Sequence, residues 1–172
     1  MAKEWEVLNS DILEKLYIEY YQVAFLYTIS LCKNKEIAED IVSEAFIKAY
    51  ITLNEEKKEF KYWLFVVCRN LWIDGLRKRK YLTDQMLDDN QLISSENVEM
   101  SFITKERNQI LYRSIMKINH QYRECLLLHY FGNLKLNQIA AIMNISNSYA
   151  RTLVSRARMK LKEKLEDEGY EF

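Results

Sequence analysis

The chain has 172 residues, and its 25 Lys and Arg balance 25 Asp and Glu, so the formal net charge is zero. Hydrophobic residues make up 49% of the chain, which excludes a disordered protein, while the absence of proline and the presence of only three glycines argue against a β-rich or loop-rich fold. We therefore predict an all-α protein. No apolar run is long enough to span a membrane, and the first ten residues do not resemble a secretory signal, so we expect a cytoplasmic location.

Apolar residues recur at helical spacing along most of the chain. The predicted helices cover about 11–31, 36–53, 59–80, 105–118, 121–131, 135–143 and 147–165. Asp11 is expected near the start of the first helix, and Asn34 interrupts the pattern after it.

Residues 82–104 differ from their surroundings. They are acidic, rich in Asp, Asn, Ser and Gln, and only weakly periodic, which predicts a flexible linker with a short helix at 85–87. The chain is thus expected to form two small helical domains, 1–81 and 105–172, joined by this acidic linker.

The zero net charge hides a strong segregation of charge. The net charges by segment are −6 for 1–56, +6 for 57–81, −5 for 82–104, +3 for 105–134, +6 for 135–162 and −4 for 163–172. The average alone would argue against a nucleic-acid-binding protein, but the local field depends on the blocks. Solvated helix faces are the alternative explanation, and they explain a 28-residue stretch without any acid less well.

The segment 136–165 has the spacing of a helix-turn-helix motif. Ala140 lies where two crossing helices need a small side chain, and Asn144 lies where the turn needs a residue that tolerates positive φ. The last helix is predicted to bury one stripe, made of Ala150, Leu153, Val154, Ala157, Leu161 and Leu165.

The other faces of the last helix carry polar and basic side chains. Those predicted to meet duplex DNA are Ser148, Tyr149, Arg151, Thr152, Ser155, Arg156 and Arg158. Arginine can bridge guanine O6 and N7 in the major groove, and Ser and Thr can reach bases or phosphates. The residues from Arg156 to Lys162 are expected to meet phosphates. A solvated basic face on a bundle helix is the alternative.

The helix at 59–80 mixes aromatic and basic residues, a combination that suits single-stranded nucleic acid. Aromatic rings stack on unpaired bases, and an Asn can hydrogen-bond to their edges. Trp63, Asn70, Asp74 and Arg77 share one stripe of this helix. Most of its aromatic residues should nevertheless belong to the core, so only one or two are expected to face nucleic acid.

The helix at 36–53 carries an acidic stripe in which Glu36, Asp40, Glu44 and Lys48 repeat every four residues. An acidic surface repels DNA but suits a basic protein partner. A solvated face with a Glu44–Lys48 ion pair is an equally good explanation.

The cysteines Cys32, Cys68 and Cys125 are isolated, and His120 and His129 lack a matching ligand cluster. A zinc site or a disulfide framework is therefore not expected, and the cysteines are interpreted as small core residues. No cofactor or catalytic activity is expected either.

Three stretches, in this order, resemble the extracytoplasmic-function branch of bacterial sigma factors. Residues 38–46 (AEDIVSEAF) are similar to region 2.2 of that family. The segment 60–79, with FKYWL, RNLWID and RKR, is similar to regions 2.3 and 2.4, and 138–161, with QIA and SRARMKL, is similar to region 4.

The resemblance implies a role for each set of residues. Glu39, Asp40, Ser43, Glu44 and Lys48 would dock on the clamp helices of the largest subunit of core RNA polymerase. Phe60, Trp63 and Asn70, with the 54–59 loop, would capture a flipped base of the −10 promoter element, while Arg69, Arg77 and Lys78 would hold the DNA backbone there. Ser148, Tyr149, Arg151, Thr152 and Ser155 would read the −35 duplex.

The resemblance also implies the partners. These are core RNA polymerase, through its clamp helices and its flap, promoter DNA, and an anti-sigma factor that holds the chain inactive and can retain it at the membrane. The linker would thread toward the polymerase active-site channel. Asn119, Gln138 and Ser43 depart from the family pattern, in which Pro, Glu and Gln are common, so individual contacts need not carry over.

Two other functions compete with a promoter-specificity subunit. A stand-alone regulator would bind duplex DNA through 121–165 and use 1–81 for sensing or dimerisation. A helical enzyme would need a metal at Asp84, Asp88 and Asp89, but these lie in a polar linker without a nucleophile–base pair. The charge blocks further predict that a fragment 105–162 binds DNA more tightly, and with steeper salt dependence, than the whole chain.

Overall fold

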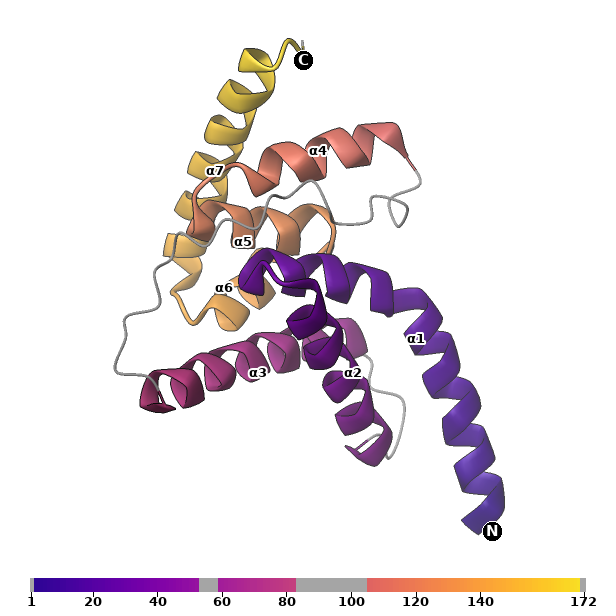
Figure 1. The fold of residues 1–172 in the computed structure, drawn as a ribbon. Helices are drawn as coiled ribbons and strands as arrows, with labels where there is room; N and C mark the ends of the chain where they lie inside the picture. Colours follow the sequence, from indigo (N-terminus) through magenta and orange to yellow (C-terminus); the bar gives the residue numbers. More distant parts are fainter. Residues whose placement is uncertain (1, 53–58, 83–104, 171–172) are drawn as a thin grey trace. The chain divides into compact units, whose positions relative to one another are not determined.

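The computed structural model describes residues 2–52, 59–82 and 105–170, and within these ranges the regular structure consists of seven helices (Figure 1). The chain divides into two compact units, the first holding α1 to α3 and the second α4 to α7. The all-α prediction is confirmed. The short helix predicted at 85–87 lies outside the described residues.

The described residues of the first unit form three helices, and α1 packs against both others. They are α1 (Ala2–Cys32), α2 (Lys35–Thr52) and α3 (Phe60–Leu82). The helix α1 begins nine residues earlier than predicted, so Asp11 lies inside a helix and does not cap one. Neither proline nor glycine interrupts 2–10, so nothing in that segment ends the helix.

The junction of α1 and α2 is a tight turn at the predicted place. Lys33 has φ of 51°, and its N–H donates to the carbonyl of Ile29 at 2.8 Å. The side chain of Asn34 then accepts a hydrogen bond from the N–H of Ile37 at 3.0 Å. Because that N–H has no partner inside α2, Asn34 caps the helix in the usual way.

Aromatic rings fill the core of the first unit. Tyr27 of α1 meets Phe65 of α3 edge to face, with ring centroids 5.0 Å apart, and Tyr17 meets Phe46 of α2 at 4.9 Å. Such pairs contribute about 0.5–1.5 kcal/mol beyond the area they bury. The buried stripe of α2 comprises Ala38, Ile41, Val42, Ala45, Phe46 and Ala49, as its spacing predicts. The small alanines in it let the neighbouring helices approach closely.

The second unit comprises α4 (Glu106–Met116), α5 (His120–Tyr130), α6 (Leu136–Met143) and α7 (Asn147–Asp167). The helices α5 and α6 both pack on α7. Asn119 caps α5 by accepting a hydrogen bond from the N–H of Gln121 at 2.9 Å. Its side chain thus provides a good helix start.

Glu168 ties the end of α7 to α4. Its carboxylate accepts hydrogen bonds from Ser114 at 3.0 Å and from Lys117 at 2.8 Å, across more than fifty residues of sequence. These contacts, that with Lys117 first, lower the pKa of the Glu168 carboxyl below its usual value. The acidic C-terminal segment therefore has a structural role in the second unit.

The cysteines fit the predicted role of core residues at two of three positions. Cys68 and Cys125 are buried, and burial raises the pKa of each thiol to about 12, so neither is a reactive thiolate. Cys32 is only partly buried, at the end of α1. None of the described helices is long and apolar enough to cross a bilayer.

Candidate nucleic-acid interface

The turn between α6 and α7 has the geometry that its sequence predicts. Asn144 ends α6 in the left-handed region, with φ of 56° and ψ of 49°. The N–H of Ile145 then bonds back to the carbonyl of Ala140 at 3.0 Å. The hydroxyl of Ser146 accepts a hydrogen bond from the N–H of Tyr149 at 3.2 Å and so caps α7.

The helix α7 divides into the two faces that were predicted. All six side chains of its buried stripe are buried: Ala150, Leu153, Val154, Ala157, Leu161 and Leu165. Every side chain predicted to meet the −35 duplex is exposed: Ser148, Tyr149, Arg151, Thr152, Ser155, Arg156 and Arg158. The fold therefore presents these seven residues on one rigid element, and no acid lies in the first turn of the helix.

The C-terminal half of α7 differs from its first half in charge pairing. Lys160 pairs with Glu163 at 2.6 Å and Lys162 pairs with Glu166 at 3.6 Å. A lysine engaged with a carboxylate gives up part of its attraction for phosphate. The phosphate contacts predicted for Arg156 to Lys162 are therefore best supported at the two arginines.

Phe60, predicted to contact a base in the −10 element, does not fit that role because its side chain is only 4% exposed. Its ring lies 5.8 Å from that of Tyr20, 6.0 Å from Phe46 and 5.7 Å from Trp63. It packs between α1 and α2 and lies under Trp63. A base cannot reach it without opening this core.

The remaining −10 residues of α3 are at least partly accessible. Asn70, Arg77 and Lys78 are exposed, while Trp63 and Arg69 are half-buried. Arg77 forms an ion pair with Asp74 at 3.5 Å, so part of its charge is already compensated.

Arg79 is a further cation of α3, and the sequence analysis did not name it as a separate DNA contact. The guanidinium of Arg79 lies 5.0 Å from the centroid of the Trp72 ring, and its Nε donates to the carbonyl of Gly75 at 3.3 Å. Trp72 precedes Arg79 by about two helical turns, so the two side chains share one face of α3. Both contacts hold the arginine side chain along its own helix.

The predicted polymerase-docking residues lie on α2. Asp40, Ser43, Glu44 and Lys48 are exposed and Glu39 is half-buried. Glu44 pairs with Lys48 at 3.1 Å and Lys35 pairs with Glu39 at 4.0 Å, in the i, i+4 spacing of a helix.

The exposed face of α2 also carries large apolar side chains that sequence reasoning missed. Ile47 is 60% exposed and Ile51 is 71% exposed, with Tyr50 beside them at 50%. The sequence did contain a sign of this surface. Ile47 and Ile51 are spaced i, i+4 and share a helix face with the acidic residues Asp40 and Glu44. Clustered exposed apolar side chains indicate a contact surface.

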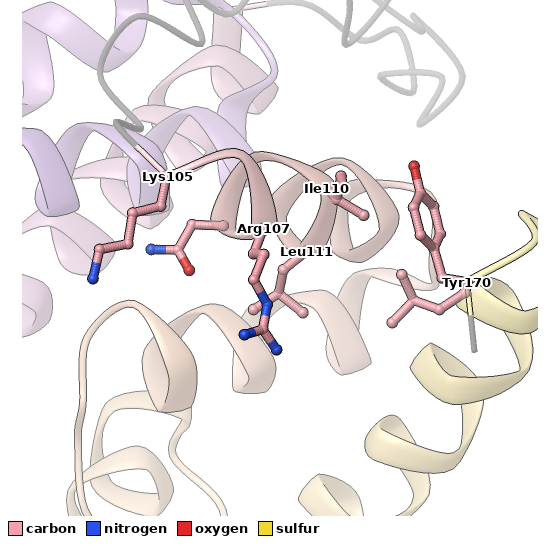
Figure 2. A pocket seen from close by; sticks show the side chains of 7 residues that line it. Lys105, Arg107, Ile110, Leu111 and Tyr170 are labelled. Carbon is pink, nitrogen blue, oxygen red and sulfur yellow. The ribbon is translucent and has the colours of Figure 1, made fainter. Parts of the chain in front are cut away.

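A pocket of about 730 Å³ opens in the second unit, between the start of α4 and the end of α7 (Figure 2). Its lining comprises Lys105, Arg107, Asn108, Ile110, Leu111, Leu165 and Tyr170. Ile110 and Leu111, predicted to face the core, are half-buried and line this pocket. No periodicity in the sequence shows where two helix ends diverge, so this pocket was not predictable.

Among the described residues, no group of three or more His, Cys, Asp or Glu side chains is placed to hold a metal ion. Asp84, Asp88 and Asp89, the metal ligands of the enzyme alternative, lie outside the described residues.

Two family models match the chain in the order of its two units. The model described as sigma-70 region 2 matches residues 16–81, and the model described as sigma-70, region 4 matches residues 108–161. The first match covers all three described helices of the first unit in part or whole, and the second covers α5, α6 and most of α4 and α7.

Among curated proteins, the chain is similar to the ECF RNA polymerase sigma factors SigM and SigW of Bacillus subtilis (strain 168). It is 31% identical to SigM over 154 residues, which cover 87% of this chain and 93% of SigM. It is 28% identical to SigW over 170 residues, which cover 92% of this chain and 89% of SigW.

Two solved structures share the fold. The sigma factor RpoE in complex with the anti-sigma factor NepR from Bartonella quintana matches with a TM-score of 0.67 and 23% identity, over 89% of this chain and 96% of that one. CnrH in complex with the cytosolic domain of CnrY matches with a TM-score of 0.59 and 18% identity, over 96% and 95%. At these identities the two matches establish the fold alone.

Proposed function

This chain belongs to the ECF family of RNA polymerase sigma factors, and we propose that its first unit meets the −10 promoter element while its second unit reads the −35 element. A member of this family gives core RNA polymerase its promoter specificity and is not itself a catalyst. One observation on α7 carries the proposal. All the residues predicted to read the −35 duplex are exposed, while the whole apolar stripe of the same helix is buried.

In the second unit, the first three turns of α7 enter the major groove of the −35 duplex. Arg151 and Ser155 are one helical turn apart on an exposed face and can reach base edges. Arg156 and Arg158 lie further along and hold phosphates.

In the first unit, α3 holds the opened strand of the −10 element. Trp63 stacks on an unpaired base and Asn70 hydrogen-bonds to a base edge, while Arg69, Arg77 and Lys78 contact the backbone. Phe60 supports this platform from below through its ring contact with Trp63. This assignment replaces a direct base contact by Phe60.

The first unit docks on core RNA polymerase through α2. Asp40 and Glu44 supply an acidic field for a basic partner, and Ile47 and Ile51 supply apolar area beside them. An acidic surface mainly raises the association rate and orients the partner, whereas apolar area buried at the interface slows dissociation. The combination suits the clamp helices of the largest polymerase subunit.

The second unit has room for a separate polymerase contact at the pocket between α4 and α7. Ser148 and Leu165 are about 25 Å apart along α7, at 1.5 Å per residue. DNA at one end of the helix and protein at the other would therefore not collide. We assign the contact with the polymerase flap to this pocket.

An anti-sigma factor is the expected regulator, since two structural relatives are recorded in complexes with NepR and with the cytosolic domain of CnrY. The chain would work in the cytoplasm, where promoter DNA and polymerase are, and the anti-sigma factor can hold it at the membrane. The stand-alone regulator is not favoured, because it leaves the sigma-70 region 2 match over 16–81 without a role.

Mapping transcription start sites after overexpression of the chain tests this proposal. The induced start sites should share two sequence elements, centred near −10 and −35, that other start sites lack. Induced transcripts without a shared pair of elements would contradict it.

A further inference from the structure

A second, smaller pocket of about 400 Å³ lies where the end of α5 meets α6 and α7. Its lining comprises His129, Leu136, Arg151, Val154, Ser155, Arg158 and Met159. Both arginines of this pocket come from α7, and α6 contributes only Leu136. None of these described lining residues is an acid. The pocket therefore gathers hydrogen-bond donors of α7 beside the imidazole of His129, at a place where an anion would be attracted.

Two neighbouring rings of α5 hold the guanidinium of Arg158. One of its terminal nitrogens, Nη2, is within hydrogen-bond distance of His129 Nε2. The guanidinium carbon also lies 5.9 Å from the centroid of the Tyr130 ring, and the rings of His129 and Tyr130 are themselves 5.1 Å apart. A long arginine side chain that is exposed to solvent is thus fixed from two sides.

The contact with Arg158 determines which nitrogen of the His129 imidazole carries the proton. A guanidinium only donates, so Nε2 of His129 must accept and the proton must lie on Nδ1. Burial first, and then the charge of Arg158, lower the pKa of His129, while the carbonyl of Leu134 acts against them. The neutral imidazole is therefore the form that the surroundings favour near neutral pH.

We propose that His129 and Tyr130 are positioning residues that hold the Arg158 guanidinium ready for a backbone phosphate of the −35 duplex. This inference rests on the proposed function of α7. One arginine N–H is engaged by His129, and the rest of the planar fork stays available for phosphate oxygens. Holding the side chain in place before binding removes the loss of side-chain freedom that binding would otherwise cost.

The test is the salt dependence of binding by the full chain to duplex DNA of mixed sequence, since phosphate contacts do not depend on sequence. Arg158→Ala should lower the slope of log affinity against log salt by about 0.9, the value for one phosphate contact. His129→Leu should weaken binding at every salt concentration while keeping most of the slope, because Arg158 still meets the phosphate but is no longer held in place beforehand. It should have little further effect on affinity in the Arg158→Ala background. His129→Gln, which keeps an acceptor near the position of Nε2, should retain the wild-type affinity.

Tyr130→Leu provides a second variant, because Tyr130 is 43% exposed and leucine keeps an apolar side chain there, so the change should not disturb folding. It should also weaken binding, by less than His129→Leu. The inference is overturned if Arg158→Ala lowers the slope while His129→Leu and Tyr130→Leu both bind with wild-type affinity. If Arg158→Ala and Arg151→Ala both leave duplex binding unchanged, the proposed DNA face of α7 fails instead.

Binding measured over a range of pH distinguishes two roles of His129, a hydrogen-bond acceptor for Arg158 and a direct contact with phosphate. Arg158 and Arg151 are the charged groups beside His129 in the pocket, and Tyr130 is its titratable neighbour on α5. Protonated His129 cannot accept a hydrogen bond through Nε2, so wild-type affinity should fall in acid. Because the pKa of His129 is lowered, the fall should come at a pH below the ordinary histidine pKa of about 6.5, and His129→Gln should not show it. A wild-type affinity that rises in this range, and is flat in His129→Gln, would mean that the imidazolium itself binds phosphate, and would overturn the acceptor role.

Discussion

Arg151 lies in the second turn of α7, exposed on the face that we assign to the major groove. If it bridges a guanine, Arg151→Ala should weaken binding of the −35 element by roughly 1–3 kcal/mol, the usual worth of one bidentate base contact. The loss should disappear on a duplex in which that base pair is changed. Competition binding with the two duplexes measures both effects, and an equal loss on all sequences would reassign Arg151 to a phosphate.

Gly132, just after α5, is held close to the backbone of that helix. A Cβ built there would lie 2.5 Å from the carbonyl oxygen of Leu128, and the N–H of Gly132 donates to the carbonyl of Leu127 at 2.9 Å. Gly132→Ala must therefore shift the backbone, and we expect a loss of about 1–3 kcal/mol in the free energy of unfolding. Chemical denaturation measures this loss.

Gly75 provides the matched control for Gly132. It lies inside α3, and a Cβ there would meet only the end of the flexible Arg79 side chain, at 3.6 Å. Gly75→Ala should raise the free energy of unfolding by about 0.5–1 kcal/mol, because alanine favours a helix interior. If both substitutions changed the free energy of unfolding equally, the close approach at Gly132 would not be the cause of the loss.

Some single residues were predictable from sequence and others were not, for a physical reason. Asn144 was predictable because a positive φ at a helix end depends on the local chain alone. Phe60 was not, because its burial depends on rings of α1 and α2 that are distant in the sequence. The exposure of Ile47 and Ile51 was missed for the same reason, since spacing cannot tell a large apolar residue that faces solvent from one that faces the core.

At the scale of elements, α2 carries two different kinds of contact surface on its exposed face. Replacing Ile47 and Ile51 by serine should weaken binding to core RNA polymerase at least about tenfold, the equivalent of about 1.4 kcal/mol. Both side chains are exposed in the free chain, so thermal stability should barely change. Titration of labelled chain with core polymerase, without DNA, measures the affinity.

Met159→Ser is a suitable control for the α2 variant. It removes a comparably exposed apolar side chain, 62% accessible, from α7. Its affinity for core polymerase should stay near wild type. Asp40→Ala should act differently from the isoleucine variant, since loss of a charge at the edge of an interface mainly slows association and reduces its salt dependence.

Element boundaries followed local signals wherever such signals exist. The start of α7 at Asn147 and the end of α6 at Met143 lie where they were predicted. The start of α1 was missed because the segment 2–10 has neither a cap nor a breaker that differs from the interior of a helix. The pocket between α4 and α7 depends on how two helix ends diverge, which no local pattern encodes.

At the scale of the whole molecule, zero net charge arises because two +6 blocks, one in each unit, and the +3 segment 105–134 are balanced by three acidic segments. We expect a fragment 105–170 to bind duplex DNA more tightly than the full chain, with a steeper salt dependence, because it lacks the acidic first segment and the linker. The shorter fragment 105–162, suggested by charge alone, would lose Leu165 and Glu168. Their loss would remove a buried side chain and the link to Ser114 and Lys117.

Fluorescence anisotropy at several salt concentrations compares the fragment with the full chain. The fragment's fold is checked first by circular dichroism, so that a misfolded sample is not scored. A fragment that is folded but binds no more tightly than the full chain would contradict the idea that the acidic segments limit non-specific binding.

The central claim is that this chain gives core RNA polymerase the ability to start at particular promoters, through α3 and α7. Run-off transcription with purified core polymerase, the full chain and DNA spanning a mapped start site tests it most directly. We predict one defined transcript that requires both the chain and core polymerase, and that falls when the −35 element or Arg151 is changed. Tight sequence-specific duplex binding by the chain alone, with no promoter-dependent transcript above that of core polymerase, would contradict the claim.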